Sequence, residues 1–239
     1  MKKTSDPSTA PDGVAKDTPQ ERGHIFNRDN ELVSSFTHFA GMLLSIAGLV
    51  LLVVYAVRYA TPWHVVTFSV YGASMILLYL ASSVYHLLYI SDKVRGILRQ
   101  IDHMAIFVLI AGTYTPICLV PLRGGWGWAL FGCIWACAVA GILVKVFWMN
   151  APRWLYTLFY ILMGWMALVA LYPLIQRMPT STLCWLFGGG LAYTIGGVQY
   201  ALKWPRLKNK YFGFHEIFHI FILLGSVCHF IMMWQILYL

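Results

Sequence analysis

Charged residues are scarce in this sequence. Only 11% of its 239 residues are charged and 59% are hydrophobic, whereas ordinary globular domains are about a quarter charged and about half apolar. Beyond residue 33 the acidic residues are Asp92, Asp102 and Glu216 alone. This composition indicates an integral membrane protein rather than a water-soluble domain.

Several further features are missing, and each removes a class of protein. The strand alternation of outer-membrane barrels is absent, and so are nucleotide-binding loops and Rossmann glycine patterns. No apolar core follows Lys2 and Lys3, so we expect no cleavable signal peptide. The cysteines are odd in number and lie within apolar runs, which indicates packing rather than a disulfide framework, a metal site or a redox role: Cys118, Cys133, Cys137, Cys184 and Cys228.

Apolar runs long enough to cross a bilayer recur along the chain. A spanning helix needs about 20 apolar residues, and a backbone in lipid must satisfy its own hydrogen bonds, which favours helices. We therefore predict an all-α fold, a seven-transmembrane helical bundle over residues 34–239, preceded by a disordered polar tail over residues 1–33. The predicted spans are Phe36–Val57, Val65–Leu88, Ile101–Val120, Trp126–Val144, Leu155–Ile175, Leu183–Leu202 and Phe212–Leu237.

The net charge of +8 is explained by topology rather than by nucleic-acid binding. The tail and the connections expected on its side of the membrane hold 14 of the 17 Lys and Arg residues, and the opposite side holds Arg58, Arg123 and Arg177. Because basic loops stay inside, this asymmetry predicts a cytoplasmic N-terminus, an outside C-terminus, an odd number of spans and residence in the inner membrane. We expect membrane lipids as partners and no nucleic acid; the sequence carries no signal for an oligomeric state.

Polar residues from three predicted helices fall at one depth near the cytoplasmic side. Ser82 and His86 are four residues apart near the end of the second helix, and His215 and His219 are four apart at the start of the seventh. Residues at this spacing share a helix face. Asp102 opens the third helix at the same depth. Because ionisable side chains are costly in a membrane and usually mark a function, these five residues form one candidate site.

The residue types suit an open zinc site. Three imidazoles, those of His86, His215 and His219, leave a coordination position for water, and zinc makes such a water nucleophilic at neutral pH. Asp102 could hold that water and act as general base. Ser82 could orient an imidazole or donate to a developing oxyanion.

Other polar residues near this depth leave alternatives open. His38 suits a capping or interfacial role, and His103 lies about 100° around its helix from Asp102. His229 lies about 15 Å beyond His219 along the helix, which favours packing or hydrogen bonding over metal binding. Glu216, in a His-Glu-x-x-His pattern, would be the general base of a membrane zinc protease.

These motifs resemble the haemolysin III family, the bacterial branch of the progestin and adipoQ receptor superfamily. The resemblance rests on Ser82-x-x-x-His86, on Asp102, and on His215 through His219, with similar stretches at 31–38, 111–116 and 225–229. It implies seven helices, a cytoplasmic N-terminus, and zinc held by the three histidines with Asp102 and Ser82 in support.

For function, the resemblance implies receptor signalling and hydrolysis of ceramide-like amides in eukaryotic relatives, and pore formation in the bacterial branch. Three classes therefore stay open: a zinc-dependent hydrolase of lipid amide or ester bonds, a receptor or regulator of membrane state with structural zinc, and a pore-forming haemolysin. A membrane zinc protease is a fourth hypothesis.

Overall fold

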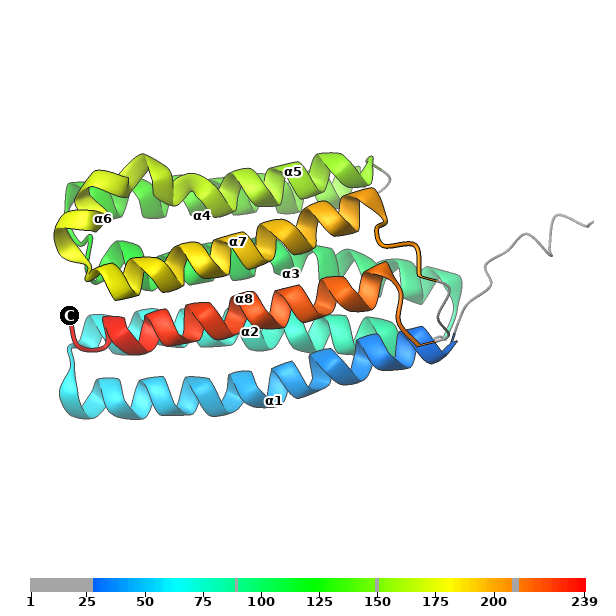
Figure 1. Cartoon of the computed structure of the whole chain (residues 1–239), viewed down its shortest axis with the longest axis horizontal. Coiled ribbons are helices and arrows are strands. Elements are labelled where there is room, and N and C mark those ends of the chain that lie inside the picture. The colour runs from blue at the N-terminus through cyan, green and yellow to red at the C-terminus, as the bar shows by residue number, and fades with distance from the viewer. Residues whose placement is uncertain (1–27, 89, 149–150, 208–210) are drawn as a thin grey trace, which may run out of the picture.

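The structure, a computed structural model, describes residues 28–88, 90–148, 151–207 and 211–239. These residues form helices, turns and loops without a β-strand, which confirms the all-α prediction. The helices are α1 (Arg28–Tyr59), α2 (Pro62–Leu87), α3 (Asp92–Leu119), α4 (Gly125–Phe147), α5 (Arg153–Gly164), the 3₁₀ helix η1 (Trp165–Ala170), α6 (Leu171–Arg177), α7 (Thr180–Leu202) and α8 (Phe214–Ile236) (Figure 1).

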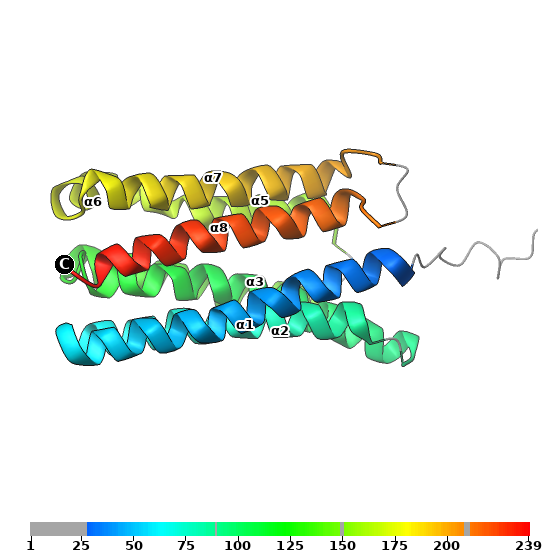
Figure 2. The ribbon, with the colours of Figure 1, turned by 60° about the horizontal axis from the view of Figure 1, so that its bottom comes forward.

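The helices run side by side and close into a ring. In chain order, α1 contacts α2, α2 contacts α3, α3 contacts α4, and α4 contacts α5. The ring is completed by contacts of α5 with α7, of α7 with α8, and of α8 with α1. Figures 1 and 2 show this arrangement from two directions. Because the chain alternates in direction, α1, α3, α5 and α8 all begin at one end of the ring, opposite the C-terminus (Figure 1). We name this end the α1 end.

Six segments are long and apolar enough to cross a membrane: Asn30–Tyr59, Pro62–Leu87, Asp92–Leu119, Gly125–Phe147, Arg153–Arg177 and Phe214–Ile236. The remaining predicted span corresponds to α7, a helix of 23 residues that does not reach the same hydropathy. Five glycines, three threonines, a serine and a glutamine lower its apolar content. The structure therefore supports a polytopic membrane protein with six candidate spans and one additional helix of similar length.

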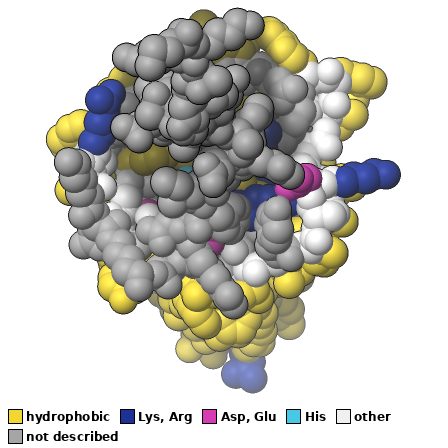
Figure 3. All heavy atoms as spheres, turned by 90° about the vertical axis from the view of Figure 1, so that its right-hand side faces the viewer, with side chains coloured by type: hydrophobic (Ala, Val, Ile, Leu, Met, Phe, Trp, Pro, Cys, Tyr) yellow, Lys and Arg dark blue, Asp and Glu magenta, His cyan; other side chains and the backbone are white. Residues whose placement is uncertain are grey.

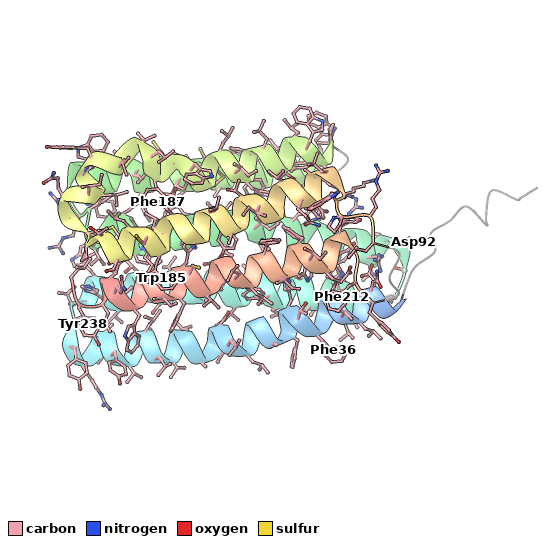
Figure 4. All side chains as sticks on the ribbon, viewed as in Figure 1. Phe36, Asp92, Trp185, Phe187, Phe212 and Tyr238 are labelled. Atoms are coloured by element: carbon pink, nitrogen blue, oxygen red, sulfur yellow. The ribbon has the colours of Figure 1, made fainter. Side chains whose placement is uncertain are left out.

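Apolar side chains cover the flanks of the ring. Leu44, Val57 and Phe147 are each at least two-thirds exposed, and Phe36 points away from the bundle (Figure 4). The view onto the α1 end shows Lys and Arg at the rim and hydrophobic side chains along the flanks (Figure 3). Such apolar flanks suit contact with lipid, where no water competes for the surface.

Small residues let α7 and α8 approach closely. A Cβ atom on Gly189 would lie 2.4 Å from the ring of His229, and one on Gly196 would lie 2.7 Å from Cβ of Phe221. Helix pairs in membranes use such positions because packing, rather than water exclusion, holds them together.

At the α1 end, α1 begins earlier than its apolar run. It starts at Arg28 rather than Phe36, so residues 28–33, expected within the disordered tail, are helical; residues 1–27 lie outside the described residues. Polar residues lower hydropathy without preventing helix formation, which is why an apolar-run search misses this extension.

The third and fourth helices also extend beyond their predicted bounds. α3 begins at Asp92 instead of Ile101, and the Ser91 side chain caps it by accepting a hydrogen bond from the Val94 amide at 3.3 Å. Asp102 therefore lies in the third turn of α3, not the first. α4 continues past its expected end to Phe147.

Candidate metal site

Three histidines from two helices meet inside the ring near the α1 end. His86 lies one residue before the end of α2, and His215 and His219 occupy the first two turns of α8, as predicted. Their spacing places the α8 pair on one face. One ligand atom from each of the three lies within 4.8 Å of the others. The structure thus brings together the residues singled out as metal ligands.

The orientation of His86 is set by Glu31. Nδ1 of His86 lies 2.6 Å from Oε2 of Glu31, while Oε1 of Glu31 accepts a hydrogen bond from Arg95 at 3.1 Å. A carboxylate can only accept, so Nδ1 of His86 must carry the proton. In the neutral ring, Nε2 then keeps its lone pair.

A second contact fixes His219 in the same way. Nδ1 of His219 lies 3.2 Å from the backbone oxygen of Ser34. Because a carbonyl oxygen only accepts, Nδ1 donates and Nε2 retains its lone pair. Outer partners of this kind, a carboxylate for one histidine and a carbonyl for another, commonly orient metal-binding imidazoles.

Two imidazole nitrogens face one another in the cluster. Nε2 of His215 lies 3.1 Å from Nε2 of His86. The lone pair on His86 Nε2 needs a proton or a cation opposite it. Two nitrogens bound tetrahedrally at about 2.0–2.1 Å from one zinc ion would lie about 3.3 Å apart. The observed separation and the available lone pairs therefore fit a single bound metal ion.

The contacts from α1 were missed by sequence reasoning, which placed Glu31 in a disordered tail. Glu31, Ser34 and His38 follow the i, i+3, i+7 spacing that marks one helix face. If the predicted first helix had been extended to Arg28, this spacing would have indicated that the three residues share one face of it.

Asp102 and Ser82 lie beside the three histidines. Both residues line the cavity, and Ser82, His86 and Lys145 all act on the Asp102 carboxyl group. Ser82 is buried, with 2% exposure. The pair from α2 and α3 thus shares the polar end of one cavity with the histidines.

Glu216 is engaged away from the imidazoles although it lies between two of them in sequence. Its Oε1 accepts a hydrogen bond from Ser34 Oγ at 3.0 Å, and its Oε2 accepts from the Gly213 backbone amide at 2.7 Å. The second contact caps the start of α8. This carboxylate holds α8 to α1, which is a structural role.

The remaining histidines lie at different positions relative to the three-histidine cluster. His38 stacks face to face on His219, with ring centroids 3.6 Å apart and planes 8° apart. His103 lines the cavity, and its backbone oxygen accepts a hydrogen bond from Tyr160 at 3.0 Å. His229 lies outside the cluster with Nε2 3.2 Å from the Leu186 oxygen, which confirms the hydrogen-bonding role expected for it.

A cavity of about 1460 Å³ opens from this cluster, larger than the ~300–1,000 Å³ of ordinary small-molecule sites. Its polar end contains the histidines, and its other walls are largely apolar and aromatic. These walls include Leu109, Ile110, Tyr114, Trp165, Leu186 and Ile222. A cavity polar at one end and apolar along its length suits an amphiphilic molecule.

One known protein family matches most of this chain. The family described as "Haemolysin-III related" matches residues 26–230. The chain belongs to the haemolysin III family. This confirms the resemblance carried by the Ser-x-x-x-His, Asp and His-x-x-x-His motifs.

Individual relatives fit the same assignment. The chain is 39% identical over 206 residues to the hemolysin-3 homolog of Bacillus subtilis (strain 168), covering 86% of this chain and 93% of the relative. It is 40% identical over 200 residues to hemolysin-3 of Bacillus cereus, covering 84% and 88%. The human monocyte to macrophage differentiation factor is 26% identical over 188 residues, covering 74% and 72%, which fits the wider receptor superfamily.

Proposed function

We propose that this membrane protein is a zinc-dependent hydrolase of lipid amide or ester bonds. The observation that carries the proposal is the convergence of three imidazoles at the polar end of a large, mostly apolar cavity. Three neutral histidines without a fourth protein ligand are the donor set of open zinc sites. Among the described residues, the cluster contains no fourth His, Cys, Asp or Glu.

His86, His215 and His219 would hold the ion. When bound, zinc supplies Lewis-acid activation of water and of a carbonyl group at neutral pH. Glu31 and the Ser34 carbonyl keep two of the rings in the tautomer that offers Nε2.

Asp102 would accept the proton of the attacking water, because its carboxyl group lies on the cavity beside His86. Ser82 would orient that carboxyl group by hydrogen bonding to it. The apolar walls would hold the acyl chain, so that the scissile bond is positioned at the histidine end.

A receptor or regulator with structural zinc is the second candidate. It is favoured by the way the cluster ties α1, α2 and α8 together through Glu31–His86 and Ser34–His219. A protease with Glu216 as base is disfavoured, since both oxygens of that carboxylate already accept hydrogen bonds.

We also infer that the α1 end is cytoplasmic, that α7 is a seventh pass, and that the protein resides in the inner membrane. The uneven distribution of Lys and Arg and the position of α7 between α5 and α8 support these inferences.

The proposed activity is tested by incubating zinc-loaded protein with a panel of N-acyl and O-acyl lipids and measuring released fatty acid. Asp102→Asn keeps the size of the side chain and should lower turnover about 10²–10⁴-fold, the usual worth of a general base, while zinc remains bound. If no lipid in the panel is cleaved and chelation lowers thermal stability, the structural-zinc candidate replaces the hydrolase.

A further inference from the structure

Lys145 is a buried cation that the metal site does not use. Its residue is 2% exposed, although it was expected in a basic connection between helices. It lies in the last turn of α4 and lines the cavity. A buried ammonium group in a membrane protein is costly and usually marks a function.

The environment of Lys145 compensates its charge only in part. Nζ lies 3.5 Å from the centroid of the Tyr156 ring, a cation–π contact. Asp102 acts on Lys145 electrostatically, but no ion pair joins Lys145 to a carboxylate among the described residues. The same Asp102 carboxyl group also interacts with Ser82 and His86.

Two further cations reach the same part of the cavity from other helices. Arg99 on α3 and Arg153 on α5 both line it, and both act electrostatically on His103 together with Lys145. The Arg153 guanidinium lies over the Tyr200 ring at 4.5 Å. Neither arginine forms an ion pair with a described carboxylate.

The described side chains on the cavity wall include more cations than acids: Arg95, Arg99, Lys145, Arg153, Lys203 and Arg206 against Glu31, Asp92, Asp102 and Glu216. Arg99, Lys145 and Arg153, from three helices, all act electrostatically on His103, and Asp102 is the carboxylate that acts on Lys145. Glu31, another acid on the cavity wall, already contacts His86 and Arg95. We name Arg99, Lys145 and Arg153 the cation cluster.

We propose that the cavity binds amphiphiles whose head group carries a carboxylate or phosphate, with the cation cluster contacting the head group and the apolar walls holding the acyl chain. Basic residues that only set topology would lie in solvent, whereas Lys145 is buried on the cavity wall. As a statement about the substrate, this inference rests on the proposed function; as a statement about binding, it is measured without turnover.

The test compares two probes that differ mainly in charge. Radiolabelled N-lauroylglycine carries a carboxylate, and N-lauroylethanolamine is a neutral amide with the same acyl chain. Binding is measured on the full chain in phosphatidylcholine nanodiscs, with empty nanodiscs as background. Wild type should bind the anionic probe at least about tenfold more tightly, since a hydrogen bond to a charged group is commonly worth that factor.

Variants then assign the preference to the cation cluster. Lys145→Met should weaken N-lauroylglycine binding about tenfold and leave N-lauroylethanolamine within about twofold, while Lys145→Arg should retain the preference. Lys93→Met removes an exposed lysine that does not line the cavity and should change neither. If Lys145→Met does not fold, Arg99→Gln supplies the same test on an exposed side chain.

Two further measurements ask whether the acyl chain and the histidines contribute to the preference. N-acetylglycine has the same head group without the chain and should compete only weakly; equal competition would mean a site for free anions and would overturn the proposal. His215→Ala should keep the preference for the anionic probe, because the cation cluster is intact. Loss of the preference there, or equal binding of both probes by wild type, would also overturn it. No turnover with the preference preserved would refute the hydrolase alone.

Discussion

The carboxylate of Glu31 lies 2.6 Å from Nδ1 of His86, although 55 positions separate the two residues in the chain. This contact joins the first turn of α1 to the last turn of α2 and fixes which imidazole nitrogen faces the cluster. Through it, the start of α1 belongs to the site.

Glu31→Gln should weaken metal binding about 10–100-fold, the usual effect of removing an outer partner of a metal-binding histidine. Glutamine is similar in size but lacks the charge that favours the Nδ1–H tautomer of His86. The affinity can be measured by titrating zinc-loaded protein with a chelator of known affinity. Glu216→Gln is the control, because Glu216 lies at the same end of the bundle but does not contact a metal-binding imidazole. An unchanged midpoint of the chelator titration for Glu31→Gln would refute the role of Glu31 in orienting His86.

Glu216→Gln should lower stability while leaving the site intact. The amide can still accept from Ser34, but its NH₂ group cannot accept from the Gly213 amide, so the α8 cap is lost. Loss of a cap costs about 0.5–2 kcal/mol. Thermal unfolding in detergent should show the loss, with zinc content and any turnover retained; abolished turnover with zinc in place would instead favour the protease reading.

His38 should support His219 by stacking rather than by binding metal. Neither ring nitrogen of His38 has a hydrogen-bond partner among the described residues, and its ring lies flat against His219. His38→Phe preserves a stacking ring and should keep zinc, whereas His38→Ala leaves a gap and should weaken zinc binding. Complete zinc loss in His38→Phe would make His38 a fourth ligand.

Reporter fusions test whether α7 crosses the membrane. Fusions after Met178 and after Leu207 flank this helix, and the charge asymmetry predicts a periplasmic signal at the first and a cytoplasmic signal at the second. A fusion after Leu239 should again read as periplasmic. Reporter signals from the same side of the membrane for the Met178 and Leu207 fusions would mean that α7 does not cross the membrane.

Much of the site could be predicted because helix geometry is local. Spacings of four placed Ser82 with His86 and His215 with His219 on common faces. The order of the helices then placed their ends at the same depth, where the structure finds the three rings together.

The remaining features depend on contacts between distant segments. The partner of Glu216 is Ser34, 182 positions away, and no spacing rule indicates it. Lys145 was assigned to a loop because hydropathy marks where apolar residues stop, not where a helix ends or which face is covered. Glu31 was missed for the same reason at the start of α1.

The metal content of the purified protein tests the central claim most directly. Elemental analysis of wild type should find about one zinc per chain, the content expected of a single three-histidine site, and His86→Ala, His215→Ala and His219→Ala should each lose most of it. His229→Ala should retain it, since that ring bonds to the Leu186 oxygen away from the cluster. Wild-type protein that takes up no zinc, or a His229→Ala variant that loses as much as His215→Ala, would contradict the account.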